Sequence, residues 1–104
     1  MKNITEISKV IRSKNSSPFE LTLDIILKTK EYYELLKKKE CINKKIISEL
    51  YNISENKINR IIFFDPANAI KITLMRNVVS GSPGDTDVYG AQQHGPLLNL
   101  KVDI

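Results

Sequence analysis

The feature that most constrains the fold is a strict two-residue alternation in "FELTLDIIL", residues 19–27. A period of two over nine residues is typical of a β-strand with one buried face. Polar residues occupy the other face, at Glu20, Thr22 and Asp24. The sequence therefore predicts a half-buried strand whose inward residues are Phe19, Leu21, Leu23, Ile25 and Leu27.

Three further segments have strand character. "KINRIIFF" (57–64) becomes apolar on both faces toward its end, which predicts an interior strand. "DPAN" (65–68) is typical of a turn, and "AIKITLMR" (69–76) alternates again. The cleanest alternation is "LLNLKVDI" (97–104), which predicts a last strand paired within the sheet. Its inward residues would be Leu98, Leu100, Val102 and Ile104.

Two helices are predicted between the first and second clear strands. Thr29 can cap a helix through "KEYYELLKKK", in which Tyr32, Leu35 and Leu36 share a face. Asn43 can cap a second helix within "CINKKIISELY". There Ile42 and Ile47 would form a hydrophobic staple, and Ile46, Ile47 and Leu50 an inward stripe. A single turn is predicted over residues 55–57.

The opening residues 4–12 permit two interpretations. Helical spacing is present at Ile4, Ile7, Val10 and Ile11. Asn3 with Glu6 resembles a capping box. However, β-branched "KVI" running into "RSKNSSP" also suits a strand followed by a turn. With either opening, the pattern predicts one α+β domain over residues 1–104. We expect a ferredoxin-like two-layer sandwich, with a four- to five-stranded, mainly antiparallel sheet and helices on one face.

Charge and cysteine content limit the function classes. The chain has 104 residues, no apolar run near the roughly 20 needed to span a bilayer, and no secretion signal. Cys41 is the single cysteine, which fits a reducing compartment, so we expect a cytoplasmic protein with no membrane partner. Residues 28–60 hold nine basic and five acidic groups, which accounts for the net charge of +4. Aromatic residues and arginines do not alternate with the lysines there. We therefore interpret this segment, including Lys37, Lys38 and Lys39, as a solvated helix face rather than a nucleic-acid site.

Two polar segments are predicted to be functional loops. One is "RSKNSSP" (12–18), and the other lies within "SGSPGDTDVYGAQQHGPLL" (80–98), which contains every glycine and the only histidine. Glycines there would permit close backbone approach to a ligand or partner. The candidate catalytic residues are Asp85, Asp87 and His94. The candidate substrate-binding residues are Arg12, Ser13, Lys14, Asn15, Tyr89, Gln92 and Gln93, and the candidate approach glycines are Gly81, Gly84, Gly90 and Gly95.

Each of these sites has a simpler alternative. Asp85, Asp87 and His94 are metal-ligand types, but their spacing matches no metal motif, so we expect a hydrogen-bonded loop and neither metal nor cofactor. Arg12 to Asn15 could hold a carboxylate or phosphate, or could form a solvated turn. Cys41 has no second cysteine or nearby histidine, so a structural thiol is the default.

Three blocks carry a family resemblance: "KVIRSKNSSPFELTLDIIL", "IIFFDPANAIKITLMR" and "SGSPGDTDVYGAQQHGPLL". They resemble a small bacterial family known as domain of unknown function 4387. That family in turn resembles the ferredoxin-like small domain of AtuA-like (acyclic terpene utilisation) proteins. The resemblance implies a strand at residues 8–12. It also implies a gene neighbour encoding a larger AtuA-like protein, in organic-acid or acyl-CoA degradation clusters. The related domain has a "RSGDKGD" type of turn where this chain has "RSKNSSP", so Arg12 and Ser13 align but the aspartates do not.

Two function hypotheses follow. The resemblance implies a small subunit of a two-component enzyme, which completes a site on an AtuA-like large chain. Its substrate would be a carboxylate or CoA thioester, and the reaction a hydration or lyase step on a branched unsaturated acid. Under this hypothesis the two polar loops meet at one edge of the sheet, and no nucleic acid is bound. The alternative is a non-enzymatic binding or regulatory module with an acidic or nucleic-acid partner.

Overall fold

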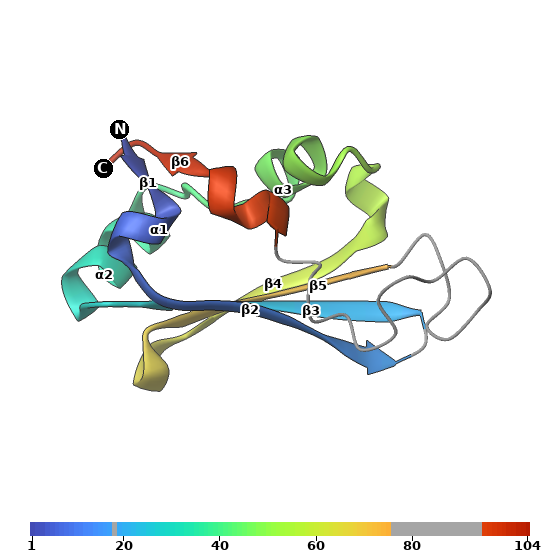
Figure 1. The fold of residues 1–104 in the computed structure, drawn as a ribbon, viewed down its shortest axis with the longest axis horizontal. Coiled ribbons are helices and arrows are strands. Elements are labelled where there is room, and N and C mark those ends of the chain that lie inside the picture. The colour runs from blue at the N-terminus through green and yellow to red at the C-terminus, as the bar shows by residue number, and fades with distance from the viewer. Residues whose placement is uncertain (18, 76–94) are drawn as a thin grey trace.

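Four strands form one antiparallel sheet in the order β2-β3-β5-β4 (Figure 1). Their bounds are β2 Ser8–Ser17, β3 Glu20–Leu27, β4 Ile58–Phe64 and β5 Ala69–Met75. The computed structural model describes residues 1–17, 19–75 and 95–104. Within these residues no helix is long and apolar enough to cross a membrane.

Most of the other described elements form a second layer on one face of this sheet (Figure 1). Two short strands in this layer, β1 and β6, pair antiparallel with each other. The layer consists of β1 Lys2–Asn3, α1 Ile4–Ile7, α2 Lys30–Lys38, α3 Lys44–Tyr51, the 3-10 helix η3 Gly95–Asn99 and β6 Lys101–Val102. The chain is thus an α+β two-layer sandwich of the predicted ferredoxin-like kind.

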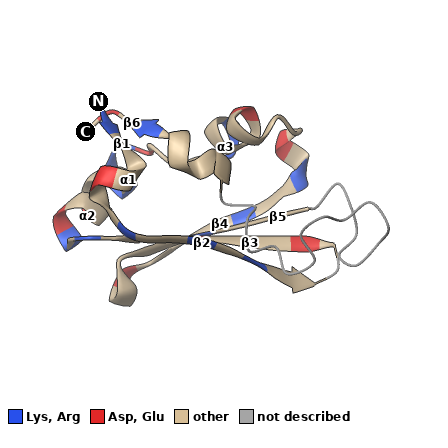
Figure 2. Ribbon diagram, viewed as in Figure 1, with Lys and Arg blue, Asp and Glu red and all other residues tan. Residues whose placement is uncertain are grey.

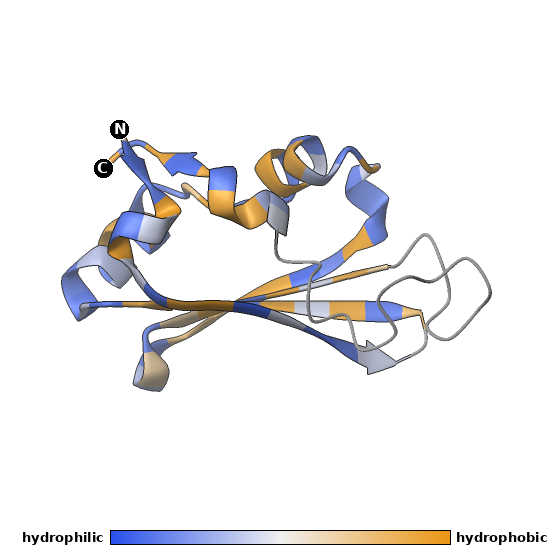
Figure 3. Cartoon of the chain, viewed as in Figure 1, coloured by the Kyte–Doolittle hydropathy of each residue, from blue (hydrophilic) through white to orange (hydrophobic). Residues whose placement is uncertain are grey.

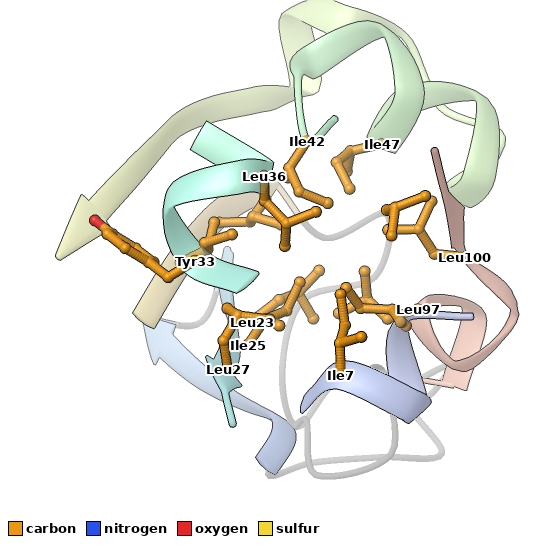
Figure 4. Close-up of a cluster of buried hydrophobic side chains, with 14 of the residues drawn as sticks. Ile7, Leu23, Ile25, Leu27, Tyr33, Leu36, Ile42, Ile47, Leu97 and Leu100 are labelled. Carbon is orange, nitrogen blue, oxygen red and sulfur yellow. The ribbon is translucent and has the colours of Figure 1, made fainter. Parts of the chain in front are cut away.

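The hydrophobic core lies between the two layers (Figure 4). Alternate residues of β3 and β5 supply its floor, and Leu23, Ile25, Ile70 and Ile72 are fully buried. The banding of polar and apolar residues along the strands reflects this alternation (Figure 3). Residues that cover the floor from the second layer include Ile4, Ile7, Tyr33, Leu36, Ile42, Ile47, Leu97 and Leu100.

Both predicted helix caps are confirmed. Thr29 Oγ1 accepts a hydrogen bond from Tyr32 N at 3.2 Å, and Asn43 Oδ1 accepts one from Ile46 N at 2.9 Å. Each cap satisfies an amide that has no partner within its own helix. Ile42 is only 3% exposed, as expected for the predicted staple. The face of α2 was predicted in part: Leu36 is buried and Tyr32 packs against the core as expected, but Tyr33 is buried there and Leu35 is exposed.

Each interpretation of the opening is confirmed for part of it. Glu6 Oε2 accepts from Asn3 N at 2.8 Å and Asn3 Oδ1 accepts from Thr5 N at 2.9 Å, so the capping box starts α1. The helix ends after one turn, and the chain is extended from Ser8. The turn Asp65–Ala67 (η2) and the turn Glu55–Lys57 (η1) are also where they were predicted.

The prediction of a sheet strand over residues 97–104 is wrong. Gly95–Asn99 is a 3-10 helix, and only Lys101–Val102 is a strand, paired with β1 in the second layer. Leu100 N donates to Leu97 O at 3.0 Å, which brings these two side chains onto the same side of the turn. Leu97 is therefore fully buried, while Leu98 is 42% exposed.

Two strand predictions also need correction. Residues 12–17 are not a loop, because β2 continues to Ser17 and pairs with β3 along its length. β4 is not interior but at the edge of the sheet, beside β5 alone. Its apolar outward residues Ile62 and Phe64 are 42% and 47% exposed, although their composition suggested burial. Phe19 precedes β3 and is 54% exposed rather than inward.

Candidate functional site

The sheet has a second face that no described helix covers (Figure 1). Strand register places two rows of residues across it. The first row runs Arg12, Asp24, Lys71 and Ile62 from β2 to β4, and the second runs Lys14, Thr22, Thr73 and Arg60. We call these eight residues the open face.

Four cations surround the middle of the open face. Arg12, Lys14, Arg60 and Lys71 are all exposed. Figure 2 shows the Lys and Arg positions of the ribbon in blue. Asp24 is the one carboxylate in the two rows, so their formal charge is 4 − 1 = +3. Neighbouring strands lie about 4.8 Å apart, so long side chains on adjacent strands can reach the same bound group. Thr22 and Thr73 add hydroxyls between Lys14 and Arg60.

Asp24 is unusual because it is a buried carboxylate on a sheet face that no described helix covers. Its side chain is 5% exposed, and its Oδ2 accepts from Arg12 Nε at 3.2 Å, while the Arg12 side chain is 62% exposed. The other oxygen, Oδ1, is buried and has no hydrogen-bond partner among the described residues. A buried acceptor without a donor typically costs about 1–3 kcal/mol. The chain therefore keeps a polar group here at some cost to stability, as functional sites commonly do.

The first set of predicted site residues is divided between the two faces of the sheet. Arg12 and Lys14 lie on the open face, opposite Asp24 and Thr22. Ser13 and Asn15 lie on the covered face, opposite Leu23 and Leu21, and Ser13 is only 8% exposed. Because these four residues form a strand and not a loop, they cannot all contact one small ligand.

Most of the second set lies outside the described residues. Gly95 is described, and a Cβ built there would meet no atom within 4 Å. The described part of the chain contains no group of three or more His, Cys, Asp or Glu that could hold a metal. The predicted residues outside it are Gly81, Gly84, Asp85, Asp87, Tyr89, Gly90, Gln92, Gln93 and His94.

A separate polar cluster connects α2 to the turn between β4 and β5. The Tyr33 hydroxyl donates to Asp65 Oδ1, and Lys37 Nζ donates to the same oxygen at 3.2 Å. These two donors hold the pKa of Asp65 below its ordinary value. Burial, and then the hydrogen bond to Asp65, raise the pKa of the Tyr33 hydroxyl. Phe63 packs edge-on against the Tyr33 ring, with centroids 6.1 Å apart, so this cluster fixes one layer to the other.

Cys41 lies in a shallow surface hollow of about 430 Å³. The thiol is 4.0 Å from the carbonyl oxygen of Asp103, and desolvation raises its pKa. Lys39 Nζ donates to the same carbonyl at 3.5 Å. Since a raised pKa leaves less thiolate, this geometry favours the structural interpretation of Cys41 over a reactive one.

The sequence analysis missed three charged members of the open face: Asp24, Arg60 and Lys71. A signal for two of them was present, because alternation assigned Asp24 and Lys71 to outward positions. Only strand register shows that these positions are neighbours, and register was not predicted. Arg60 follows a register shift between Ile58 and Arg60 in β4, so its phase could not be read from alternation alone.

These features define a small α+β domain with one covered and one open sheet face. No curated protein and no solved structure matches the chain. The sequence model of one family does match, over residues 4–101. The chain belongs to this family, the domain of unknown function DUF4387.

Proposed function

We propose that the protein is the small subunit of a two-component cytoplasmic enzyme, and that its larger partner is an AtuA-like chain. The complex would act in organic-acid or acyl-CoA catabolism. Its reaction would be a hydration or lyase step on a branched unsaturated acid or its CoA thioester. The partner and the reaction class rest on the resemblance of the three sequence blocks to the small domain of AtuA-like proteins.

The observation that supports the subunit role is the sheet face that no helix among the described residues covers. It presents the exposed apolar residues Ile62 and Phe64 beside four exposed cations. Exposed apolar side chains and arginine are both common in protein interfaces. The ion pair between exposed Arg12 and buried Asp24 adds a fixed polar feature of the kind that sets orientation between two chains.

The test is co-expression with an AtuA-like large chain from the same organism. We expect the two chains to elute together in size-exclusion chromatography at a fixed ratio. Only the complex should consume a branched α,β-unsaturated acyl-CoA, measured as loss of the enoyl absorbance. Turnover by either chain alone, or separate elution of the two chains at micromolar concentration, would contradict this function. A stable complex with no turnover on acids or thioesters would favour the regulatory alternative.

A further inference from the structure

The open face carries a more specific inference, which rests on the proposed function because it concerns the same partner. We propose that the open face binds an acidic segment of the larger chain. Carboxylates of that segment would pair with Arg12, Lys14, Arg60 and Lys71.

Charge complementarity is the first argument for an acidic protein segment. The two rows have a formal charge of +3, and their single carboxylate is already engaged by Arg12. The four cations come from three strands and span the width of the sheet. Alternate residues along a strand lie about 7 Å apart, which suits several carboxylates along an extended or helical segment.

The Arg12–Asp24 pair is the second argument. Asp24 engages Nε of Arg12, and the guanidinium remains 62% exposed. A guanidinium fixed from behind by a buried carboxylate loses less freedom when it binds another carboxylate in front. Asp24 is therefore a positioning residue, and Arg12 is the group that contacts the partner.

Two other occupants fit less well. A second copy of this chain would bring one +3 surface against another, which like-charge repulsion opposes. Single-stranded nucleic acid binds sheet faces through aromatic residues that stack with bases. The central strands instead place Thr22, Asp24, Lys71 and Thr73 on this face.

The experiment uses the whole chain and two probes, a hexaglutamate peptide and a uridine hexanucleotide, in NMR titrations at physiological salt. The test variant is Arg60→Gln with Lys71→Gln, since neither side chain has a described ion pair. The matched control is Lys38→Gln with Lys45→Gln, which removes two exposed charges from the helical layer. Affinity of each variant for the AtuA-like chain is measured in parallel.

We expect hexaglutamate to shift the amide signals of the open-face residues first. The test variant should bind hexaglutamate and the large chain about five- to tenfold more weakly, as expected for two lost surface ion pairs. The control should bind both within about twofold of the parent, since isolated surface charges contribute little.

Three results would overturn the inference: signal shifts confined to the helical layer, tighter binding of the hexanucleotide than of hexaglutamate, or equal loss in both variants. A large chain that binds the parent and the test variant equally would overturn it while leaving the proposed function intact. If the large chain does not bind at all, the proposed function fails. The hexaglutamate titration then still reports whether the open face selects carboxylates.

Discussion

The two faces of the sheet are built by the same strands but differ in what they tolerate. On the covered face Leu23, Ile25 and Ile72 are fully buried among apolar neighbours. On the open face Arg12 and Lys71 flank a buried carboxylate, and Ile62 remains exposed. The covered face therefore determines stability, whereas the residues of the open face are better explained by binding.

The largest expected effect is on the free energy of unfolding, when one isoleucine from each face is replaced by alanine. Ile72→Ala, on the covered face of β5, should lower the free energy of unfolding by about 2–5 kcal/mol. Ile62→Ala, on the open face of neighbouring β4, should cost less than about 1 kcal/mol because much of its surface is already in water. Urea denaturation of both variants measures this difference. Equal losses would mean that Ile62 is covered in solution, for example by self-association.

A second pair of substitutions tests how the C-terminal segment covers the sheet. Leu97→Ala should cost about 2–4 kcal/mol, because the side chain is fully buried, and thermal or urea unfolding measures the loss. Leu98→Ala removes the same atoms from a 42% exposed position and should cost about 1 kcal/mol or less. A larger loss of stability for Leu98→Ala than for Leu97→Ala would support the strand that alternation predicted and would contradict the 3-10 helix.

That segment also shows where sequence reasoning succeeds and fails. Caps at Thr29 and Asn43 were predictable because capping is a local interaction between residues three apart. Which side chains of residues 97–104 face the core was not predictable, because Leu97, Leu98 and Leu100 fit either a two-residue or a three-residue period. Tertiary contacts decide between them, as when Ile4 N donates to Leu100 O at 2.8 Å.

The candidate site was predicted in part for the same reason. Arg12 and Lys14 could be identified as anion-binding groups from residue type alone. Their separation from Ser13 and Asn15 depends on β2 being a strand, and polar composition suggested a loop instead. Asp24 was assigned to a solvated face, yet it is 4% exposed, and no local pattern indicates that burial.

The Arg12–Asp24 pair should respond asymmetrically to mutation. Arg12→Gln would leave a buried carboxylate without its cation, so we expect a loss of about 1–3 kcal/mol. Asp24→Val would remove the buried charge and leave Arg12 in water, so stability should change by no more than about 1 kcal/mol in either direction. Urea denaturation at neutral pH measures both. Equal losses in the two variants would mean that the pair itself stabilises the fold, which would weaken its assignment to binding.

The smallest expected effect concerns the exposed Asp65, and it depends on pH. Hydrogen bonds from Tyr33 and Lys37 hold the pKa of Asp65 below the unfolded value of 3.8. A carboxyl group whose pKa is lower in the folded state stabilises the fold above its unfolded pKa, and this contribution is lost as pH falls through the folded pKa. The parent should therefore melt slightly above Asp65→Asn from pH 5 to 7, and the difference should shrink as the pH falls below 3.8 and through the folded pKa. Thermal melts across this range measure the difference. Glu31→Gln is the control, since Glu31 lies on the same helix as Tyr33 and Lys37 and has no described ion pair. A difference that persists at low pH would show that the Asp65 side chain acts through its shape or its neutral hydrogen bonds, and not through its charge.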